Sequence, residues 1–474
     1  MKQYWNKTKV ICTIGPASNQ PRILKDMIVS GMDMARFNFS HGQMQQHGQA
    51  IKSIKSLTAS LKSPVGILQD LPGPKIRIGL LQDAFIELKE GQTFLLTAKK
   101  ILGTSFGVSI NNALFVQGLR RNNIVYLNDG LVKLVVMSKK DNNAICQVLS
   151  GGKIYPRKGV NCPEQILNLD SVTNYDLRCL RYGISLGVDF VAVSFVQRAK
   201  DILKVKNYLK RKGKHIFVIA KIERKVALDD IDQIIKVSDA VMVARGDLGI
   251  EAKLADIPFL QKEIISKANA LGRPVITATQ MLESMVNNSQ PTRAEVTDIA
   301  NAVLDGTDAL MLSEETAIGK YPVKCLRIML EIASKTESKL RMFSKQKDFN
   351  ANKSDDLIEA FSHSTVNVAA KVKAKAIIVP TQNANSIACL SRLRPEVTIV
   401  GLTSNQDIYK KLILYWGVYP VIIKSFGNLA QTLKQCVQLV RFHHIAKKND
   451  NVVIMLTKDN LLYSSNIMEV RKIS

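Results

Sequence analysis

Eight short apolar runs, each ending in polar or charged residues, predict the buried strands of a parallel sheet, because a strand covered on both faces reads as continuous apolar sequence. They are Lys9–Gly15, Asp33–Ser40, Val65–Leu71, Phe190–Val196, His215–Ile222, Ala240–Asp247, Pro274–Met281 and Ala309–Thr316. Segments of helical periodicity, such as Asp201–Lys212 and Phe259–Leu271, follow most of them. Eight strands that alternate with helices predict an α/β fold built on a (β/α)8 TIM barrel.

Polar side chains gather at the carboxyl ends of these runs, where barrel enzymes place their active sites. The amino ends look apolar or carry ordinary solvating groups. If Ile219–Glu223 and Val241–Gly249 form neighbouring strands, Glu223 and Asp247 converge, and paired carboxylates favour a hard cation such as Mg2+. Lys221 beside them is typical of a site for a phosphate or a developing oxyanion. The carboxyl ends carry Arg36, Asn38, Ser40, Asp70, Lys221, Glu223, Asp247, Thr279, Ser313 and Glu315.

Two regions interrupt or follow the barrel pattern. Between Asp70 and about Glu164, short strand-like runs are separated by turn signals, which predicts an all-β lid inserted after the third strand, over the barrel mouth. A closing helix, Tyr321–Lys339, and a polar linker, Phe343–Ser354, precede a second alternating pattern, which predicts an α/β domain with a mixed sheet. We therefore expect a catalytic barrel (1–71 and 164–340), a lid domain (72–163) and a C-terminal, candidate regulatory domain (341–474).

The runs of the lid are Phe85–Leu88, Thr93–Ala98, Ile124–Leu127, Val132–Val136 and Ala144–Leu149. Those of the C-terminal domain are the helices Leu357–Val372, Asn385–Arg392 and Gln406–Leu414 and the strands Ala376–Pro380, Thr398–Thr403, Val418–Ile423 and Val452–Thr457.

Charge, apolar content and cysteine pattern bear on whether the protein binds nucleic acid, spans a membrane or is secreted. The net charge of +26 raises the possibility of nucleic-acid binding, but the positive excess is spread over every region, without an arginine-rich arm or an RNA-binding motif. Specific nucleic-acid binding is therefore disfavoured. A basic bias shared by the proteins of the source lineage, together with a need to bind small anions, is the simpler explanation of this charge. We expect no membrane span, no secretory signal and, from seven scattered cysteines without a C-x-x-C pair, a cytoplasmic protein.

Seven motifs, met in order along the chain, resemble the pyruvate kinase family. They are Met34–Gly42, Gly73–Arg77, Lys158–Asn161, Ile219–Glu223, Ala244–Gly249, Ala278–Ser284 and Leu312–Ala317. The resemblance extends from about Thr8 to the end and is densest through Pro322. It implies a phosphotransferase that passes a phosphoryl group from phosphoenolpyruvate to ADP, giving pyruvate and ATP, the last step of glycolysis. It also implies a homotetramer.

The resemblance also assigns roles. Glu223 and Asp247 would bind Mg2+, with Mn2+ as a substitute, and Lys221 would stabilise the transferring phosphoryl group and the enolate. Arg36 would hold the substrate phosphate, and the backbone of Gly246 with the hydroxyl of Thr279 would hold the carboxylate. The nucleotide side would be Asn38, His41, Arg77 and Lys158, and Ser313 and Glu315 would support the proton relay.

Several of these roles have structural alternatives. Arg36 could pair with a barrel carboxylate, Thr279 could be a wall residue, and Ser313 and Glu315 could be purely structural. The chain as a whole could be a catalytically decayed basic scaffold or nucleic-acid-binding protein on the same fold. Another barrel that uses phosphoenolpyruvate, such as a carboxylase, is disfavoured by the lid-hinge motifs Gly73–Arg77 and Lys158–Asn161.

Two departures bear on effectors and ions. Many members bind K+ at positions matching Asn38, Ser40, Asp70 and the Leu71 carbonyl, but Lys75 stands where those members have glutamate, as in members that dispense with K+. We therefore expect no K+ requirement, unless Lys75 points into solvent. In the C-terminal domain Ala384 replaces the glycine of the family's effector loop, at Thr381–Ser386, so activation by fructose 1,6-bisphosphate is not expected to carry over. Another sugar phosphate, a nucleotide or no effector remain open.

Overall fold

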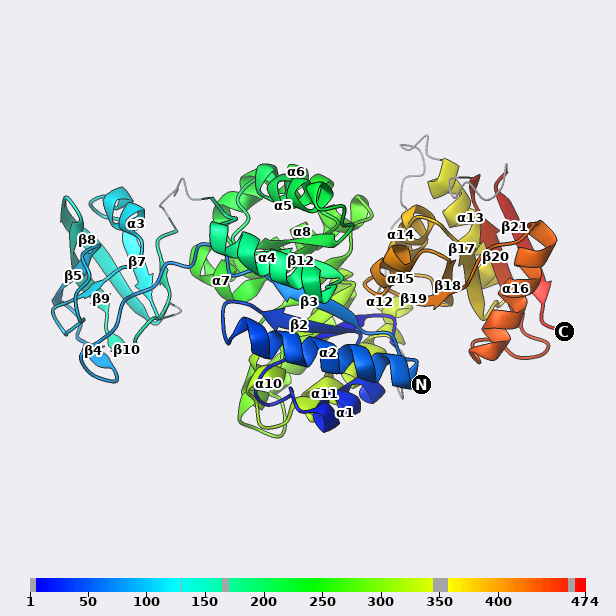
Figure 1. The fold of residues 1–474 in the computed structure, drawn as a ribbon, viewed down its shortest axis with the longest axis horizontal. Coiled ribbons are helices and arrows are strands. Elements are labelled where there is room, and N and C mark those ends of the chain that lie inside the picture. The colour runs from blue at the N-terminus through cyan, green and yellow to red at the C-terminus, as the bar shows by residue number, and fades with distance from the viewer. Residues whose placement is uncertain (1–5, 129, 164–169, 344–356, 459–464) are drawn as a thin grey trace.

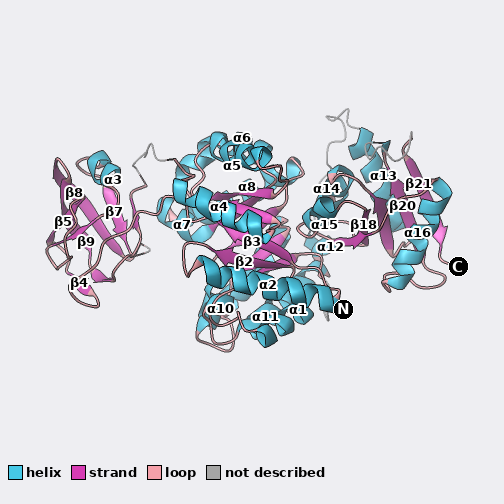
Figure 2. Ribbon diagram, viewed as in Figure 1, coloured by secondary structure: helices cyan, strands magenta, loops and turns pink. Residues whose placement is uncertain are grey.

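The computed structural model describes residues 6–128, 130–163, 170–343, 357–458 and 465–474. Three groups of elements follow one another along the long axis of the molecule, with the barrel in the middle (Figure 1). Helices surround the central sheet, whereas the group at the far left of Figure 2 is mostly strands. No helix among the described residues is long and apolar enough to span a membrane.

The central sheet is a closed barrel of eight parallel strands in the order β1-β16-β15-β14-β13-β12-β3-β2, which confirms the predicted TIM barrel. All eight predicted runs contain one of these strands. β13 and β14 are neighbours, as the convergence of Glu223 and Asp247 requires. The strands are β1 Lys9–Thr13, β2 Met34–Asn38, β3 Gly66–Asp70, β12 Phe190–Val193, β13 Phe217–Ile222, β14 Ala240–Ala244, β15 Val275–Ala278 and β16 Ala309–Leu312.

The barrel helices pack outside the strands, and their ends carry recognisable caps. At α4 the side chains of Thr173 and Asp176 form a capping box, and Gly187 ends the helix at φ 66°. The helices are α1 Pro21–Ser30, α2 Met44–Leu61, α4 Asn174–Leu186, α5 Ala199–Arg211, α6 Ile231–Val237, α7 Arg245–Glu251, α8 Ile257–Ala270, α9 Arg293–Asp305, α10 Glu314–Ala317, α11 Pro322–Glu337 and α12 Leu340–Phe343.

Seven of the eight barrel strands end before the apolar run that predicted them, and in two of these cases the early end places a candidate site carboxylate in a helix. β14 stops at Ala244 because α7 begins at Arg245, so Asp247 lies in the first turn of a helix rather than at a strand end. β16 likewise stops at Leu312, and Glu315 lies in α10. Carboxylates in a first helical turn are favoured by the unpaired N–H groups there. The acidic residues that follow these two apolar runs therefore mark the start of a helix, not the end of a strand.

The amino ends of the barrel strands are more specific than we expected. Aspartates directly before β2, β12, β14 and β16 each accept a hydrogen bond of 2.8–2.9 Å from a backbone N–H of a neighbouring strand. They are Asp33, Asp189, Asp239 and Asp308. Lys410 and Arg394, which follow the barrel in the chain, pair with Asp189 and Asp308 at 2.8 and 2.7 Å. This end of the barrel is therefore a docking face for the C-terminal group of elements.

The segment between β3 and α4, here called the lid segment, contains all the strands predicted for it. A six-stranded sheet in the order β11-β7-β8-β9-β5-β6 lies beside the pair β10-β4. The short strands β6, β10 and β11 and the helix α3 Ala113–Gly118 were not predicted. The helix is too short for a periodic signal and is capped by the Asn112 side chain. The strands are β4 Ile86–Leu88, β5 Thr93–Thr97, β6 Gly107–Ser109, β7 Ile124–Leu127, β8 Val132–Lys140, β9 Asn143–Ser150, β10 Gly152–Ile154 and β11 Val160–Asn161.

The C-terminal elements form a five-stranded sheet in the order β19-β18-β17-β20-β21, with β21 antiparallel to β20, so the predicted mixed sheet is confirmed. Two elements, α16 and β21, were not predicted. The predicted linker lies outside the described residues except for Phe343, which ends α12. The elements are α13 Leu357–Lys371, β17 Ala376–Pro380, α14 Asn385–Arg392, β18 Thr398–Thr403, α15 Gln406–Leu412, β19 Val418–Ile422, α16 Leu429–Phe442, β20 Asn451–Leu456 and β21 Ile467–Lys472.

Candidate active site

A cavity of about 1260 Å³ opens at the carboxyl ends of the barrel strands, and residues of the lid segment line part of it. It brings together most of the residues singled out in the sequence. Asp70, Leu71 and Glu315 are not among its lining residues and lie buried behind it. The predicted residues that line it are Arg36, Asn38, Ser40, His41, Lys75, Arg77, Lys158, Lys221, Glu223, Gly246, Asp247, Thr279 and Ser313.

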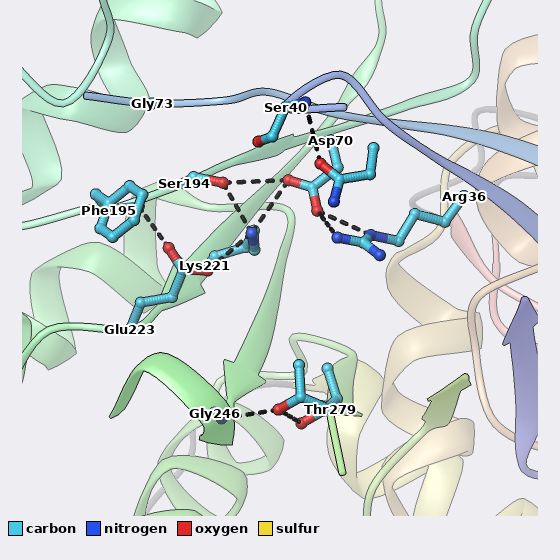
Figure 3. A network of polar contacts seen from close by, with 12 residues as sticks. Arg36, Ser40, Asp70, Gly73, Ser194, Phe195, Lys221, Glu223, Gly246 and Thr279 are labelled. Carbon is cyan, nitrogen blue, oxygen red and sulfur yellow. Dashed lines mark hydrogen bonds and ion pairs between the residues drawn. The ribbon is translucent and has the colours of Figure 1, made fainter. Parts of the chain in front are cut away.

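A chain of buried charges crosses the floor of this cavity (Figure 3). The Arg36 guanidinium donates to one oxygen of Asp70 from Nε at 2.8 Å and from Nη2 at 2.6 Å. Lys221 Nζ lies 3.2 Å from the other oxygen of Asp70 and 2.8 Å from Glu223 Oε1. The pairing of Arg36 with a barrel carboxylate, raised above as a structural alternative, is therefore present, while Arg36 still faces the cavity.

The pKa directions in this chain follow from its charges. Burial raises the pKa of the Asp70 carboxyl, but Lys221 and Arg36 outweigh it and hold that pKa below its usual value. Burial lowers the pKa of Lys221, yet Asp70 and Glu223 reverse the effect, so the net shift is upward and the ammonium stays charged. For Glu223, burial and then repulsion from Asp247 raise the pKa despite the opposing effect of Lys221.

Glu223 and Asp247 form a site with an excess of negative charge that a cation would relieve. Glu223 Oε2 accepts a 2.8 Å hydrogen bond from the backbone N–H of Phe195, which fixes the carboxylate in orientation. Among the described residues there is no group of three or more acidic, histidine or cysteine side chains that could hold a metal ion without other ligands. The two carboxylates therefore suit a hard ion such as Mg2+, whose remaining positions are filled by water and substrate oxygens.

Gly246 and Thr279 join neighbouring turns of the barrel mouth. The Gly246 N–H donates to Thr279 Oγ1 at 2.8 Å, and that hydroxyl donates to the carbonyl of Ala278 at 2.6 Å (Figure 3). Thr279 and the next residue, Gln280, both have positive φ, at 68° and 54°. A left-handed conformation is a clear departure for a β-branched residue, so this turn is held in place by its surroundings.

The predicted nucleotide side lies where the lid segment leaves and rejoins the barrel. Arg77 pairs with Gly159 in an isolated bridge, and its Nη1 donates to the carbonyl of Arg157 at 2.8 Å. Burial lowers the pKa of the His41 imidazole, and the cations Lys75, Arg77, Arg36 and Lys158 lower it further. His41 is therefore neutral at pH 7 and stands in a strongly positive field.

Lys75 is partly buried and lines the cavity, and groups on the cavity floor influence the pKa of its ammonium. Burial lowers its pKa most, and repulsion from Lys221 adds to this, while attraction by Asp247 and Glu223 partly offsets both. These surroundings favour a Lys75 that acts on the cavity over one directed wholly into solvent. Asn38, one of the K+ positions, uses its side-chain oxygen to accept from the Ser40 N–H at 3.1 Å.

Ser313 and Glu315 have different surroundings. The carboxylate of Glu315 accepts from the backbone N–H groups of Leu282 at 3.0 Å and Ser313 at 2.6 Å, so it joins two turns behind the cavity wall. This arrangement favours a structural role for Glu315. The hydroxyl oxygen of Ser313 is buried at the cavity and has no hydrogen-bond partner among the residues described.

Sequence reasoning missed three residues of the charge chain. The Ser194 hydroxyl accepts a hydrogen bond from Lys221 Nζ at 2.8 Å and donates one to Asp70 at 3.2 Å. The Thr13 hydroxyl accepts from Arg36 at 2.8 Å. Phe195 supplies the backbone N–H that holds Glu223. The available signal was position, since Ser194 directly follows β12 and Thr13 ends β1. Single hydroxyls are too common at strand ends to be selected by that signal alone.

Comparison with known proteins agrees with this geometry. The pyruvate kinase barrel domain family matches residues 5–326, and the pyruvate kinase alpha/beta domain family matches residues 359–470. The chain is 40% identical to the pyruvate kinase of Thermotoga maritima over 466 residues, covering 98% of this chain and 99% of that protein. With the pyruvate kinase of Thermococcus litoralis it shares 38% identity over 457 residues, 95% and 94% of the two chains.

Among solved structures, the crystal structure of a pyruvate kinase from Cryptosporidium parvum superposes with a TM-score of 0.90 at 32% identity. The match covers 99% of this chain and 96% of that one, so it includes the barrel, the lid segment and the C-terminal elements together. The chain therefore belongs to the pyruvate kinase family.

Proposed function

We propose that this chain is an active pyruvate kinase, which transfers a phosphoryl group from phosphoenolpyruvate to ADP and yields pyruvate and ATP. The observation that supports it most is an intact series of buried ion pairs, Arg36–Asp70–Lys221–Glu223. Three of its members line a cavity that Asp247 also lines, and Asp70 joins them from behind. A decayed scaffold would not keep buried charges paired on the floor of an open cavity, because buried ions are expensive to maintain.

Arg36 retains donors for a substrate phosphate. A guanidinium has five N–H donors, and the contacts to Asp70 and Thr13 use three of them. The two remaining N–H groups suit a phosphate oxygen in a planar, bidentate geometry. Lys221, fixed by Asp70 and Glu223, places its ammonium where negative charge grows as the phosphoryl group leaves the enolate oxygen. Charge aimed at the transition state in this way raises kcat.

The substrate carboxylate would bind at Gly246 and Thr279. Their hydrogen bonds are internal in the structure, from the Gly246 N–H to the hydroxyl and from the hydroxyl to the Ala278 carbonyl. A carboxylate oxygen is a stronger acceptor for both donors. The proton that finally reaches the enolate carbon would come through hydroxyls or water in the cavity, where the Ser313 hydroxyl has no hydrogen-bond partner in the part of the chain that the structure describes.

Glu223 and Asp247 would hold Mg2+, with Mn2+ as a substitute. The bound ion supplies a positive centre that neutralises phosphoryl and carboxylate oxygens. Glu223 keeps lone pairs for it even while Oε1 and Oε2 accept from Lys221 and Phe195. The raised pKa of Glu223, caused by burial and by Asp247, would fall when a cation enters, so metal binding would release any proton held there.

The nucleotide would approach from the lid side, with its phosphates near Asn38, His41, Arg77 and Lys158. A neutral His41 can donate or accept a hydrogen bond without adding charge, while the lysine and arginines supply the attraction. The backbone at Arg77 pairs with that beside Lys158, where the lid segment leaves and rejoins the barrel. Phosphate contacts there would also draw the lid domain, proposed as residues 72–163, toward the barrel.

Lys75 supports the proposal that K+ is not required. Lys75 lines the same cavity as Asp247, Glu223 and Lys221 and interacts electrostatically with all three, so its charge would take the place of a bound monovalent cation in offsetting the substrate charges. The same conclusion follows from the candidate monovalent-cation positions, which are Asn38, Ser40, Asp70 and Leu71. Asp70, the only carboxylate of the set, is already paired with Arg36 and Lys221.

The remaining parts of the proposal rest on family membership. We propose a cytoplasmic homotetramer composed of a catalytic barrel (1–71 and 164–340), the lid domain and a C-terminal domain (341–474), without specific nucleic-acid binding. The effector loop at Thr381–Ser386 supports weak or absent activation by fructose 1,6-bisphosphate, because Ser386 is paired with Thr457 at 2.8 Å instead of being turned outward.

A coupled assay that follows pyruvate from phosphoenolpyruvate, ADP and Mg2+ tests the proposed activity. We expect turnover that disappears when ADP or Mg2+ is omitted and is unchanged by bicarbonate, which a carboxylase would need. Asp247→Asn is the control variant. It lacks one proposed Mg2+ ligand, so its turnover should be lost if the measured activity comes from this site. Absence of turnover from protein with native circular dichroism would refute the proposal, and a gel shift with a nanomolar, salt-dependent midpoint would favour the nucleic-acid-binding alternative.

A further inference from the structure

The strained turn after β15 needs an anchor, and Arg245 is placed to supply it. Thr279 and Gln280 are consecutive non-glycine residues with φ of 68° and 54°. Each such conformation is energetically costly and persists only where the surroundings over-determine it. The hydroxyl of Thr279 also belongs to the proposed carboxylate site, so the shape of this turn matters for more than stability.

The guanidinium of Arg245 contacts the strained backbone directly. Its Nη2 donates to the carbonyl of Thr279 at 2.8 Å and to that of Gln280 at 3.3 Å. Its Nη1 lies 2.7 Å from each carboxylate oxygen of Asp298 in α9, and the side chain is 10% exposed. A single buried group therefore fixes both carbonyls of the turn to a helix on the outside of the barrel.

Arg245 is also the first residue of α7, directly before Gly246 and Asp247. The Gly246 N–H in turn contacts Thr279 Oγ1 at 2.8 Å. Two connections thus join the start of α7 to the turn after β15, one through the Arg245 side chain and one through the Gly246 backbone. Any relaxation of the turn would move the Thr279 hydroxyl away from the Gly246 N–H and change the start of α7.

We propose that Arg245 is a positioning residue, which holds the Thr279–Gln280 turn in its left-handed conformation so that the Thr279 hydroxyl and the Gly246 N–H keep the geometry of the carboxylate site. This inference rests on the proposed pyruvate kinase activity. Arginine is required because its planar fork reaches a carboxylate on one side and two carbonyls on the other, whereas the ammonium of a lysine is a single point of attachment.

The competing explanation is a buried ion pair that only stabilises the barrel. Arg394 provides the matched control, because its Nη1 lies 2.7 Å from Asp308 and its Nη2 donates to the Gly306 carbonyl, at the opposite end of the barrel. If burial of an arginine pair were the whole effect, Arg245→Lys and Arg394→Lys would alter the enzyme alike. If Arg245 positions the turn, only Arg245→Lys changes the use of phosphoenolpyruvate.

The experiment compares the native chain with Arg245→Lys, Asp298→Asn and Arg394→Lys. It measures kcat and KM for each substrate, melting temperature and mass by light scattering. For Arg245→Lys we expect kcat/KM for phosphoenolpyruvate to fall about 10²-fold, the loss typical of a misplacement of about 1 Å. KM for ADP should stay within about twofold, and Asp298→Asn should give a smaller loss of the same kind. Arg394→Lys should lower the melting temperature without this loss.

A second variant tests the role of strain. Glycine adopts positive φ without steric cost, so Gln280→Gly in the Arg245→Lys background should restore part of the lost kcat/KM. The inference is overturned if Arg245→Lys stays within threefold of the native value, if both substrates suffer equally, if mass changes account for the loss, or if Gln280→Gly restores nothing. An inactive native chain that also fails to bind phosphoenolpyruvate by calorimetry would refute the proposed function and this inference with it.

Discussion

Replacing Lys221 by methionine removes one charge from the floor of the cavity and nearly preserves side-chain length. Lys221 is 7% exposed and is paired with Glu223 at 2.8 Å and with Asp70 at 3.2 Å. After the change, Asp70 still has both contacts from Arg36. Glu223 keeps the hydrogen bond from the Phe195 N–H and the attraction of Lys75, but it loses its 2.8 Å ion pair and still faces Asp247. Of the two carboxylates, Glu223 should therefore lose more of its stabilisation in Lys221→Met than Asp70 does.

The size of the effect follows from these distances. At an effective dielectric constant of about 20, each ion pair contributes roughly 5–6 kcal/mol of gross attraction. Desolvation cancels much of it, and removing one partner of a buried pair typically destabilises a protein by about 3–5 kcal/mol. For catalysis, loss of an aimed positive charge should lower kcat by about 10³-fold or more, or roughly 4 kcal/mol of transition-state stabilisation. Binding of phosphoenolpyruvate should change far less, since Arg36 and Thr279 remain.

The stability loss should depend on pH in a defined direction. The pKa of Glu223 is already raised by burial and Asp247, and losing Lys221 raises it further. A carboxyl whose folded-state pKa lies above its unfolded value destabilises the fold once pH exceeds the unfolded pKa. The difference in unfolding free energy between native protein and Lys221→Met should therefore be largest near neutral pH and shrink as Glu223 becomes protonated in mild acid.

Urea unfolding at several pH values, together with steady-state kinetics, measures both effects. Lys206→Met is the control, because Lys206 pairs with Asp239 at 2.8 Å but is half-exposed and far from the cavity in the barrel; it should cost no more than about 1 kcal/mol. Unchanged kcat in Lys221→Met would refute the role given to this ammonium. A stability loss that grows as pH falls would refute the assignment of the unpaired charge to Glu223.

Three further predictions concern ions and assembly. The native enzyme should be nearly fully active with Mg2+ in the absence of K+, and Lys75→Glu should acquire a K+ requirement; a manyfold rise on adding KCl to native enzyme at constant ionic strength would contradict this. Removal of divalent cations by a chelator should abolish turnover, and Mg2+ or Mn2+ should each restore it in native protein but poorly in Asp247→Asn. Light scattering at micromolar concentration should give the mass of four chains, and a monomer mass would exclude the proposed tetramer.

The sequence by itself determined the architecture, because each barrel strand is buried on both faces and so leaves an unbroken apolar run. All eight runs contain a strand, and β17, α14 and β18 have the predicted bounds. Elements without that signal were missed, such as α3, which is held by one capping side chain, and the edge strand β21. The residue types at the carboxyl ends also sufficed to select Lys221, Glu223 and Asp247, since charge after a buried strand is unusual.

Only the tertiary structure decided which of these groups are partners. Ser194 and Asp70 are 124 residues apart in sequence, yet their side chains lie 3.2 Å apart. Barrel closure brings β3, β12 and β13 side by side, and no local pattern encodes that neighbourhood. The same holds for Arg245, whose sequence neighbours point to the metal site while its side chain turns to Asp298 and the β15 turn. Burial, which sets the pKa directions of Lys75 and Glu223, exists only once these strands and the lid segment enclose the cavity.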